Sequence, residues 1–291
     1  MHKSKASTST LGRKPFLKWP GGKRWIAPLL AKIIGGELQG TYFEPFTGAA
    51  SVFLELKPKK AVLSDSNGRL VEFLKIVRRH PNKVVDATWR FSNNVDCYYR
   101  VRGSHPRTEI GRAARFLFLN RTCWGGVYRL NRSGDFNVPF GKSGLKICSR
   151  AHVQAVAKVL GAALLKTEDF EAVMSAARKG DVIYADPPYT SRGENNGFLR
   201  YNESLFSWKD QQRLAHAARK ARRGGAFVAV SALHHKDVLS LYTGWWVLEV
   251  PRSSLISCDV DARQKITEVL IFSRLPRYLR QRDLGTIKRI G

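Results

Sequence analysis

The sequence predicts an α/β fold with a mostly parallel sheet, and three observations predict it. Short apolar runs alternate along the chain with segments whose apolar residues recur at helical spacing. The chain has 291 residues, which is long enough to bury a sizeable core. Hydrophobic residues make up 43% of the chain and charged residues 25%, a balance that is typical of globular proteins and argues against general disorder.

The strands of this sheet are expected at five short apolar runs, residues 41–44, 61–63, 181–185, 225–230 and 245–250. The first run ends at a Pro-x-x-Gly loop, and the second ends at an aspartate. Strands that alternate with helices are typical of α/β proteins, so we expect these runs to lie mostly parallel to one another.

Helices are expected at residues 23–34, 49–56, 68–80, 109–120 and 211–222. The last of these is an amphipathic segment between two expected strands. Before the first helix, the opening of the chain is polar, basic and rich in Ser and Thr, which predicts a loose arm.

A basic block interrupts the alternation of strands and helices. Residues 75–150 hold 16 Lys and Arg against 4 Asp and Glu, and Tyr128–Phe140 has turn-forming residues between apolar flanks, which is typical of a hairpin. We interpret this stretch as an inserted binding domain; the alternative is a solvated helical insertion. The expected division is an arm at 1–14, a discontinuous main domain at 15–67 and 151–275, an insert at 68–150, and a basic tail at 276–291.

The charge balance predicts a polyanionic partner. Fifty Lys and Arg against 23 Asp and Glu give a net charge of +27, which favours nucleic acid or, less commonly, an anionic membrane surface. No apolar run is long enough to span a membrane or to form a signal peptide, and the four cysteines form no Cys-x-x-Cys pair. We therefore expect a cytoplasmic protein with no membrane partner and no metal.

The sharpest motif is Asp186-Pro187-Pro188-Tyr189, which directly follows the apolar run 182–185. A strand that ends in this way brings a carboxylate and an aromatic ring to the edge of the sheet where α/β proteins bind ligands. Asp186 and the Pro187 carbonyl can accept the two hydrogens of an exocyclic amine, and Tyr189 can stack on a base. The plain alternative is a strand followed by a proline-rich turn.

A second motif is Glu44-Pro45-Phe46-Thr47-Gly48, where a short strand turns into a helix. The start of such a helix presents unpaired N–H groups to a ligand. Asp65 lies 21 residues after Glu44 at the end of the next expected strand, a spacing that suits ribose hydroxyls. The pair indicates a nucleoside-bearing cofactor. A P-loop is disfavoured, because Phe136 stands where its first glycine would lie.

A third motif, Trp19-Pro20-Gly21-Gly22-Lys23, is by itself as consistent with a loop and a solvated lysine as with a binding site. In this order, however, the three motifs and the insert resemble the Dam-like (D12 class) DNA adenine N6-methyltransferases from about residue 16 to 272. The matching segments are Leu17–Lys23, Glu44–Gly48, about 68–150 and Asp186–Tyr189.

The resemblance implies a Rossmann-like, S-adenosylmethionine-dependent methyltransferase sheet with an inserted, mainly helical target-recognition domain that carries a β-hairpin. It implies that Asp186, Pro187, Pro188 and Tyr189 form the catalytic loop that receives the adenine. It also implies a set of methyl-donor contacts, which are Trp19, Lys23, Glu44, Phe46, Gly48, Asp65 and Asp186.

One departure concerns the first loop, which in this family commonly reads Phe-x-Gly-x-Gly. The chain has Ala50 at the second glycine. A methyl group is tolerated there if the position is already helical, but it is a problem if φ must be positive. We expect the helical case, because Ala49 and Ala50 lead into a helical pattern.

The insert also resembles the family's DNA-recognition hairpin. Arg129 is expected to bind guanine edges, or alternatively a phosphate, and Trp124 to wedge into the base stack, or alternatively to pack in the hairpin core. Members that recognise GATC commonly have Asn at the position of Gly125, so the recognition sequence stays open. The DNA-binding residues implied by the resemblance are Arg121, Trp124, Gly125, Val127, Arg129, Asn131, Pro139, Arg252 and Arg263.

The expected reaction is transfer of a methyl group from S-adenosylmethionine to a flipped adenine in double-stranded DNA by a monomeric enzyme. Transfer to cytosine C5 would need a cysteine nucleophile, usually after a proline, and no cysteine follows a proline here. The alternatives are a catalytically silent DNA-binding protein on the same fold, a cytosine-N4 methyltransferase, and an RNA or protein amine methyltransferase.

Overall fold

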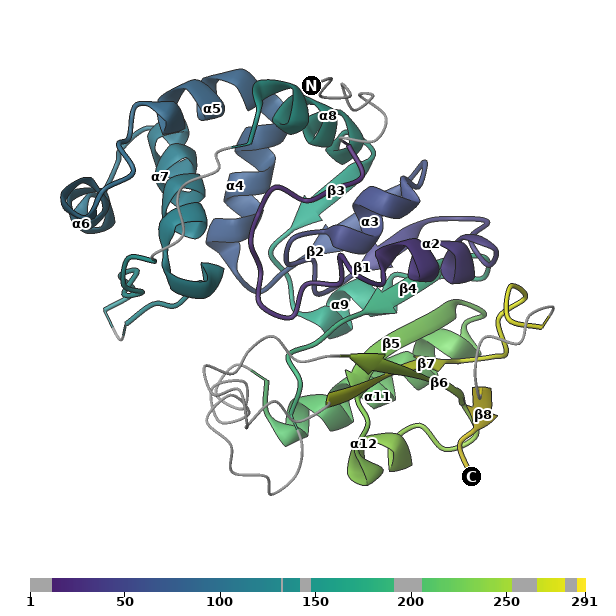
Figure 1. The fold of residues 1–291 in the computed structure, drawn as a ribbon. Coiled ribbons are helices and arrows are strands. Elements are labelled where there is room, and N and C mark those ends of the chain that lie inside the picture. Colours follow the sequence, from purple (N-terminus) through teal and green to yellow (C-terminus); the bar gives the residue numbers. More distant parts are fainter. Residues whose placement is uncertain (1–11, 132, 142–147, 191–205, 253–265, 281–286) are drawn as a thin grey trace, which may run out of the picture. The chain divides into compact units, whose positions relative to one another are not determined.

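The computed structural model describes residues 12–131, 133–141, 148–190, 206–252, 266–280 and 287–291 (Figure 1). The chain divides into two compact units. The first unit comprises Met1–Ala31, Gly48–Lys59 and Asn67–Thr167, and the second comprises Lys32–Thr47, Lys60–Ser66 and Glu168–Gly291. Helix α2 (Ala27–Gly35) crosses from the first unit into the second.

The second unit contains the sheet that the sequence predicts. Its strands lie in the order β2-β1-β4-β5-β7-β6-β8. All five predicted strands are present, shifted by a few residues at their ends. The strands are β1 (Tyr42–Glu44), β2 (Ala61–Ser64), β4 (Val182–Ala185), β5 (Phe227–Leu233), β6 (Trp246–Arg252), β7 (Ile266–Phe272) and β8 (Ile287–Arg289).

The expectation of a mostly parallel sheet holds for only part of these strands. Strands β2, β1, β4 and β5 are parallel to one another, whereas β7 pairs antiparallel with both β5 and β6, and β8 pairs antiparallel with β6. A short apolar run does not encode the direction of its partner, and β7 lies between β5 and β6 although it follows both in sequence.

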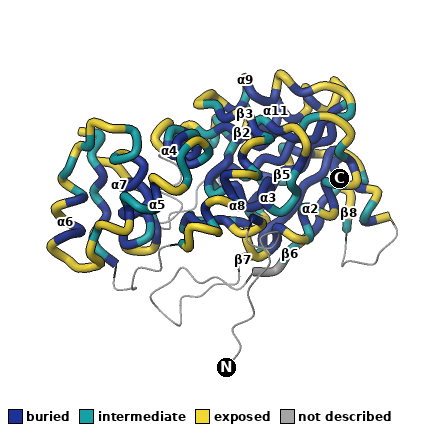
Figure 2. The backbone as a smooth tube through the Cα atoms, turned by 90° about the horizontal axis from the view of Figure 1, so that it is seen from above, coloured by how far each residue is buried: buried dark blue, intermediate teal, exposed yellow. Residues whose placement is uncertain are grey.

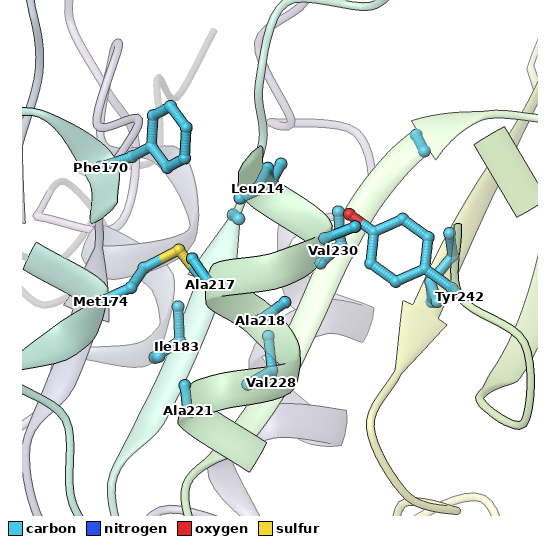
Figure 3. Close-up of a cluster of buried hydrophobic side chains, with 14 of the residues drawn as sticks. Phe170, Met174, Ile183, Leu214, Ala217, Ala218, Ala221, Val228, Val230 and Tyr242 are labelled. Carbon is cyan, nitrogen blue, oxygen red and sulfur yellow. The ribbon is translucent and has the colours of Figure 1, made fainter. Parts of the chain in front are cut away.

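One face of this sheet is covered by helices and forms an apolar core. The side chains of Ile183, Val228 and Val230 point toward α11 (Trp208–Arg223), which presents Leu214 and several alanines to them (Figure 3). The alanines allow the helix to approach closely. Helices α9 (Phe170–Ser175) and α12 (Lys236–Ser240) contribute to the same cluster. Strand β4 is buried throughout. Strand β5 is buried except at its last residue, and its tube is dark blue over most of its length (Figure 2).

The first unit is mainly helical. Side chains of Asn67, Asn94, Thr108 and Ser149 accept hydrogen bonds from backbone N–H groups at the starts of α4, α6, α7 and α8. The elements are α3 (Ser51–Leu56), α4 (Gly68–Arg79), α5 (Pro81–Trp89), α6 (Val95–Gly103), α7 (Glu109–Thr122), the 3₁₀ turn η1 (Trp124–Gly126), α8 (Arg150–Leu160) and strand β3 (Ala163–Lys166).

The expectation that position 50 is helical is wrong. Ala50 is the residue before α3, with φ 56° and ψ 34°, so it adopts the left-handed conformation. Its carbonyl accepts a hydrogen bond from the Leu54 N–H, which starts the helix, while its own φ stays positive. The chain therefore has a methyl group where glycine would avoid strain.

The predicted hairpin within Tyr128–Phe140 is formed by isolated bridges instead of a continuous ladder. Antiparallel bridges join Leu130 to Phe136 and Cys123 to Phe140.

Among the described residues, every helix is too short or too polar to cross a membrane.

Candidate active site

The carboxyl ends of three parallel strands in the second unit bring polar side chains to one edge of the sheet. Glu44 is the last residue of β1, Asp65 follows β2, and Asp186 follows β4. The register aligns Glu44 with Leu63 and Phe43 with Ile183, so these three strands end at nearly the same level. Carboxylates at this edge suit a ligand that carries a positive charge or hydroxyl donors.

Polar residues also project from the face of the sheet opposite the apolar core. Side chains alternate between the two faces of a strand. Phe43, Ile183 and Val230 point into the apolar core, so Tyr42, Tyr184 and Ser231 point to the opposite face of the sheet. The Tyr42 hydroxyl donates to Glu44 Oε2 at 2.9 Å. The Tyr184 and Ser231 hydroxyls are 2.8 Å apart and hydrogen bonded.

The Asp-Pro-Pro-Tyr loop, residues 186–190, leaves this edge directly after β4. Asp186 and Tyr189 are half-buried, and Pro187 is buried. The Tyr189 hydroxyl donates to Glu268 Oε2 on β7 at 2.9 Å. One residue further, the Gln211 side chain of α11 donates from Nε2 to the Thr190 hydroxyl at 3.1 Å. Hydrogen bonds to two different elements thus fix the far end of the loop.

The three tyrosines near this edge are held in their neutral form. Burial, then the negative charges of Asp186 and Glu268, raise the pKa of Tyr189 well above its ordinary value. Burial also raises the pKa of Tyr42 and of Tyr184, with Glu44 and Asp186 as the leading charges, respectively. Each of these hydroxyls is therefore protonated at neutral pH and is able to donate a hydrogen bond.

The loop after β1 is tied to the end of β2. The Thr47 N–H and hydroxyl both donate to the Ser64 carbonyl, at 2.9 Å each, and the hydroxyl is also 3.0 Å from the Glu44 carbonyl. Glu44 is buried, with 3% of its surface exposed. Phe46 stacks on Phe170 with ring centroids 5.4 Å apart, so its ring belongs at least partly to the apolar core.

The remaining donor contacts implied by the resemblance lie in the first unit. Lys23 is buried and donates from Nζ to the Gly21 carbonyl at 2.9 Å, so the alternative of a solvated lysine is wrong. The Trp19 ring stacks on Tyr128 with centroids 6.3 Å apart. Gly48 has φ 46°, and a Cβ there would lie 2.9 Å from Trp19 Cδ1, so only glycine fits beneath this ring.

Residues 124–141, which we call the recognition segment, combine a buried base with exposed side chains. Phe136 and Val138 pack in a cluster with α6 and α7, and the Tyr98 hydroxyl donates to the Val138 carbonyl at 2.8 Å. Trp124 is 56% exposed, so packing in a hairpin core is not its role. Gly125 has φ 63°, a conformation that Asn adopts more readily than most residues, which leaves the recognition sequence open.

The other predicted DNA contacts have varied surroundings. Arg129 is exposed, and its Nε donates to Asn137 Oδ1 at 2.8 Å. Asn131 is exposed and accepts the Asp135 N–H at 2.8 Å, which closes the turn. Arg121 is half-buried and donates to the Phe16 carbonyl at 3.1 Å.

Val127 is half-buried, and Pro139 is exposed and accepts the Trp124 N–H at 2.9 Å. Arg252 ends strand β6, but its side chain is not described, and Arg263 lies outside the described residues.

The described cysteines do not resemble nucleophiles. Cys97 and Cys123 are buried, and burial raises the pKa of the Cys123 thiol to about 11. Burial also raises the pKa of Cys148. These two thiols are therefore protonated at neutral pH. Within the described residues, no group of three or more His, Cys, Asp or Glu side chains is arranged to hold a metal ion.

The sequence interpretation missed several residues of this edge: Tyr42, Tyr184, Gln211 and Glu268. A signal for the two tyrosines was available, because Tyr42-x-Glu44 and Tyr184-x-Asp186 both place a tyrosine two residues before a carboxylate on a strand, hence on the same face. Glu268 gave no such signal, because its strand was not predicted.

Comparison with known proteins identifies the family to which this chain belongs. The family model described as D12 class N6 adenine-specific DNA methyltransferase matches residues 19–252. The chain belongs to this family. The resemblance and the Rossmann-like methyltransferase fold are thereby confirmed, and the chain is a D12-class DNA adenine N6-methyltransferase.

Individual relatives of this D12-class methyltransferase match over nearly their full length. The chain is 30% identical to the type II methyltransferase M1.LlaDCHI of Lactococcus lactis, over 89% of this chain and 94% of that protein. It is 32% identical to the type II methyltransferase M.MjaIII of Methanocaldococcus jannaschii, over 89% and 99%. It is 33% identical to a DNA adenine methylase of Serratia marcescens, over 90% and 98%.

Proposed function

We propose that the Asp-Pro-Pro-Tyr loop receives an adenine that is flipped out of double-stranded DNA, and that it presents N6 of this base for methylation. The observation that carries the proposal is the position of Asp186. It follows a buried strand, at the edge where Glu44 and Asp65 also end their strands, in a loop that two hydrogen bonds fix at its far end.

The chemistry follows from the groups of this loop. The Asp186 carboxylate and the Pro187 carbonyl accept the two N–H groups of N6, which localises the nitrogen lone pair that is otherwise delocalised into the ring. The Tyr189 ring stacks on the base. Positioning of this kind can contribute about 7–11 kcal/mol to lowering the barrier. In this reaction N6 would bond to the methyl carbon while the bond from that carbon to the sulfonium sulfur breaks. The sulfur would keep the bonding electron pair as a neutral thioether, and N6 would release one proton to water.

S-adenosylmethionine is the methyl donor in this proposal, and when bound it supplies an electrophilic methyl on a sulfonium. The residues of the second unit fit it. A buried Glu44 and a half-buried Asp65 suit a cationic, hydroxyl-rich molecule. Asp65 would bind the ribose hydroxyls, with Glu44 and Phe46 nearby. The roles of Trp19, Lys23 and Gly48 as donor contacts stay predictions based on the resemblance.

The recognition segment is proposed to bind the DNA duplex, within an inserted domain at residues 68–150. The exposure of Trp124, Arg129, Asn131 and Pro139 supports this role, because side chains must be accessible to enter a groove. Arg121, Gly125, Val127, Arg252 and Arg263 remain predicted contacts, and a single copy of the chain is expected to act on each site.

The test is Asp186→Asn, which keeps the size of the side chain but removes its charge. We expect methyl transfer to unmethylated genomic DNA to fall about 10- to 100-fold, because the neutral amide oxygen is a weaker acceptor than the carboxylate and localises the lone pair of N6 less strongly. Retention of DNA on a gel should be unchanged.

The matched control is Asp237→Asn on α12, which removes a carboxylate of the same unit that lies 3.9 Å from His235 Nδ1. It should methylate at the wild-type rate. Persistence of wild-type methylation in Asp186→Asn would overturn the assignment of the loop.

A further inference from the structure

We infer that Glu268 is a positioning residue for the methylation reaction, acting through the Tyr189 hydroxyl to fix the ring that stacks on the target base. The inference rests on the proposed function of the Asp-Pro-Pro-Tyr loop and extends it to a strand that contributes none of its motifs. Three features carry it: the place of Glu268 in the sheet, its burial, and its hydrogen bond.

The sheet topology brings Glu268 to the active edge from the opposite direction. Strand β7 is antiparallel to β5, so its beginning lies where β5 ends, and Glu268 pairs with Leu233, the last residue of β5. The backbone pairing continues one step further, since the His234 N–H donates to the Thr267 carbonyl at 3.0 Å. Because β7 runs in the opposite direction, Glu268 near its start lies at the same edge of the sheet as the last residues of the parallel strands.

The side chain of Glu268 points to the face of the sheet opposite the apolar core that α11 covers. The register aligns Ser231 with Leu270 and Leu233 with Glu268, so these residues alternate in step. Glu268 therefore shares a face with Ser231 and, through the pairing of β4 with β5, with Tyr184. Its neighbour Val269 lies on the other face, in the apolar core.

Burial makes a purely structural role a poor explanation for this carboxylate. Glu268 is 3% exposed. Removing an ionised carboxylate from water is costly, and well-packed apolar residues of similar volume commonly give an equal or higher stability. A buried acid at the edge of an active site is better explained by what it holds in place.

What it holds is the tyrosine of the loop. The Tyr189 hydroxyl donates to Glu268 Oε2 at 2.9 Å, within the usual range for a hydroxyl donor. The raised pKa of Tyr189 keeps the hydroxyl protonated, so this donor is present throughout the neutral range. The bond at the tip of the ring and the backbone at its base together fix the long axis of the ring. Because a phenolic O–H prefers to lie in the plane of its ring, the position of the acceptor also favours one ring orientation, which a stacking role requires.

A second hydrogen bond of the loop makes it possible to distinguish positioning of the Tyr189 ring from anchoring of the backbone. The Thr190 hydroxyl is held by Gln211 of α11, a bond that fixes the path of the backbone but touches no ring. Loss of the Gln211 bond should loosen the whole loop, whereas loss of the Glu268 bond should free the ring alone.

The experiment is a double-mutant cycle on Tyr189→Phe and Glu268→Gln, with single-turnover methylation of unmethylated genomic DNA under saturating S-adenosylmethionine. Tyr189→Phe keeps the ring but loses the donor, and we expect the rate to fall about 10- to 100-fold, as loss of a hydrogen bond to a charged group gives. Glu268→Gln keeps the volume and a weaker acceptor, and we expect a fall of about 3- to 10-fold.

The double variant should be no slower than the slower single variant, because both changes remove one interaction. The KM for DNA and the retention of DNA should stay within about twofold of wild type, a separation of kcat from KM that a general loss of folding would not give. Glu249→Gln is the matched control: Glu249 is exposed on β6, pairs with Val269, and should leave the rate unchanged.

Multiplicative losses in the double variant would overturn the inference, as would a wild-type rate for Glu268→Gln. If Glu268→Gln does not fold, Tyr189→Phe breaks the same bond from the other end, and a wild-type rate there overturns it equally. Failure of the inference differs from failure of the proposed function: a slowed Asp186→Asn variant together with a fully active Glu268→Gln variant would remove only the role of Glu268.

Discussion

The Asp-Pro-Pro-Tyr loop and the recognition segment are both irregular stretches with exposed or half-exposed aromatic residues, yet they are held in opposite ways. The loop follows a buried strand, and side chains from β7 and α11 hold its last residues through buried partners. The recognition segment has a buried base at Phe136 and Val138, but isolated bridges and exposed side chains toward its tip. The difference matches two tasks: chemistry needs fixed groups, whereas binding a duplex needs accessible side chains that adapt to it.

The substitution with the largest expected effect tests whether the Asp-Pro-Pro-Tyr loop positions the base. Tyr189→Ala removes both the ring and its bond to Glu268. We expect kcat to fall about 100-fold or more, because stacking on a base contributes about 1–3 kcal/mol and the hydroxyl bond adds to it. DNA retention should change little. A variant whose DNA affinity falls as much as its kcat would show that the ring binds the duplex and does not position the base.

Trp124→Ala tests the recognition segment. We expect it to have a smaller effect, and to change DNA binding more than the rate of the reaction. The side chain is 56% exposed, so its removal should leave the melting temperature within about 1 °C. If the ring enters the base stack, the KM for DNA should rise about tenfold, and kcat should change less. Trp124→Phe is the control that keeps an aromatic wedge. Loss of stability with unchanged KM would instead assign the ring to packing.

Arg129→Ala sharpens the role of the same segment. Its Nε is oriented by Asn137 Oδ1, and the side chain is exposed. A base contact predicts that discrimination at one base pair relaxes by about 1–3 kcal/mol, while other positions keep their preference. A phosphate contact predicts uniform weakening across sequences. Sequencing of modified adenines after expression in a methylation-free host distinguishes the two outcomes and reports the recognition site.

The same comparison shows what the sequence could predict. Strand β4 and the carboxylate after it were predictable, because an apolar run and a rare tetrapeptide are both local signals. The exposure of Trp124 could not be predicted, since the alternative of core packing also fitted the sequence. Glu268 could not be found at all: its strand lies between β5 and β6 by long-range pairing, and no local pattern encodes that position.

Ala50 shows a third way in which a loop is held, and it gives the smallest expected effect. Unlike the half-buried Asp-Pro-Pro-Tyr loop, Ala50 is buried, with 1% exposure, and it keeps a left-handed φ of 56° despite its methyl group. Ala50→Gly removes a strain of about 1–2 kcal/mol. It also loses the buried methyl, worth about 0.8 kcal/mol, and adds about 0.4–1 kcal/mol of unfolded-state entropy.

These contributions nearly cancel, so the free energy of unfolding of Ala50→Gly should lie within about 0.5 kcal/mol of wild type. Ala114→Gly is the matched control, because Ala114 is equally buried at 1% but lies inside helix α7. It loses the same methyl and gains the same unfolded-state entropy without relieving strain. Urea denaturation should therefore find Ala114→Gly less stable than Ala50→Gly by about 1–2 kcal/mol. Equal losses would mean that position 50 carries no strain, and that the loop before α3 is as relaxed as a helix interior.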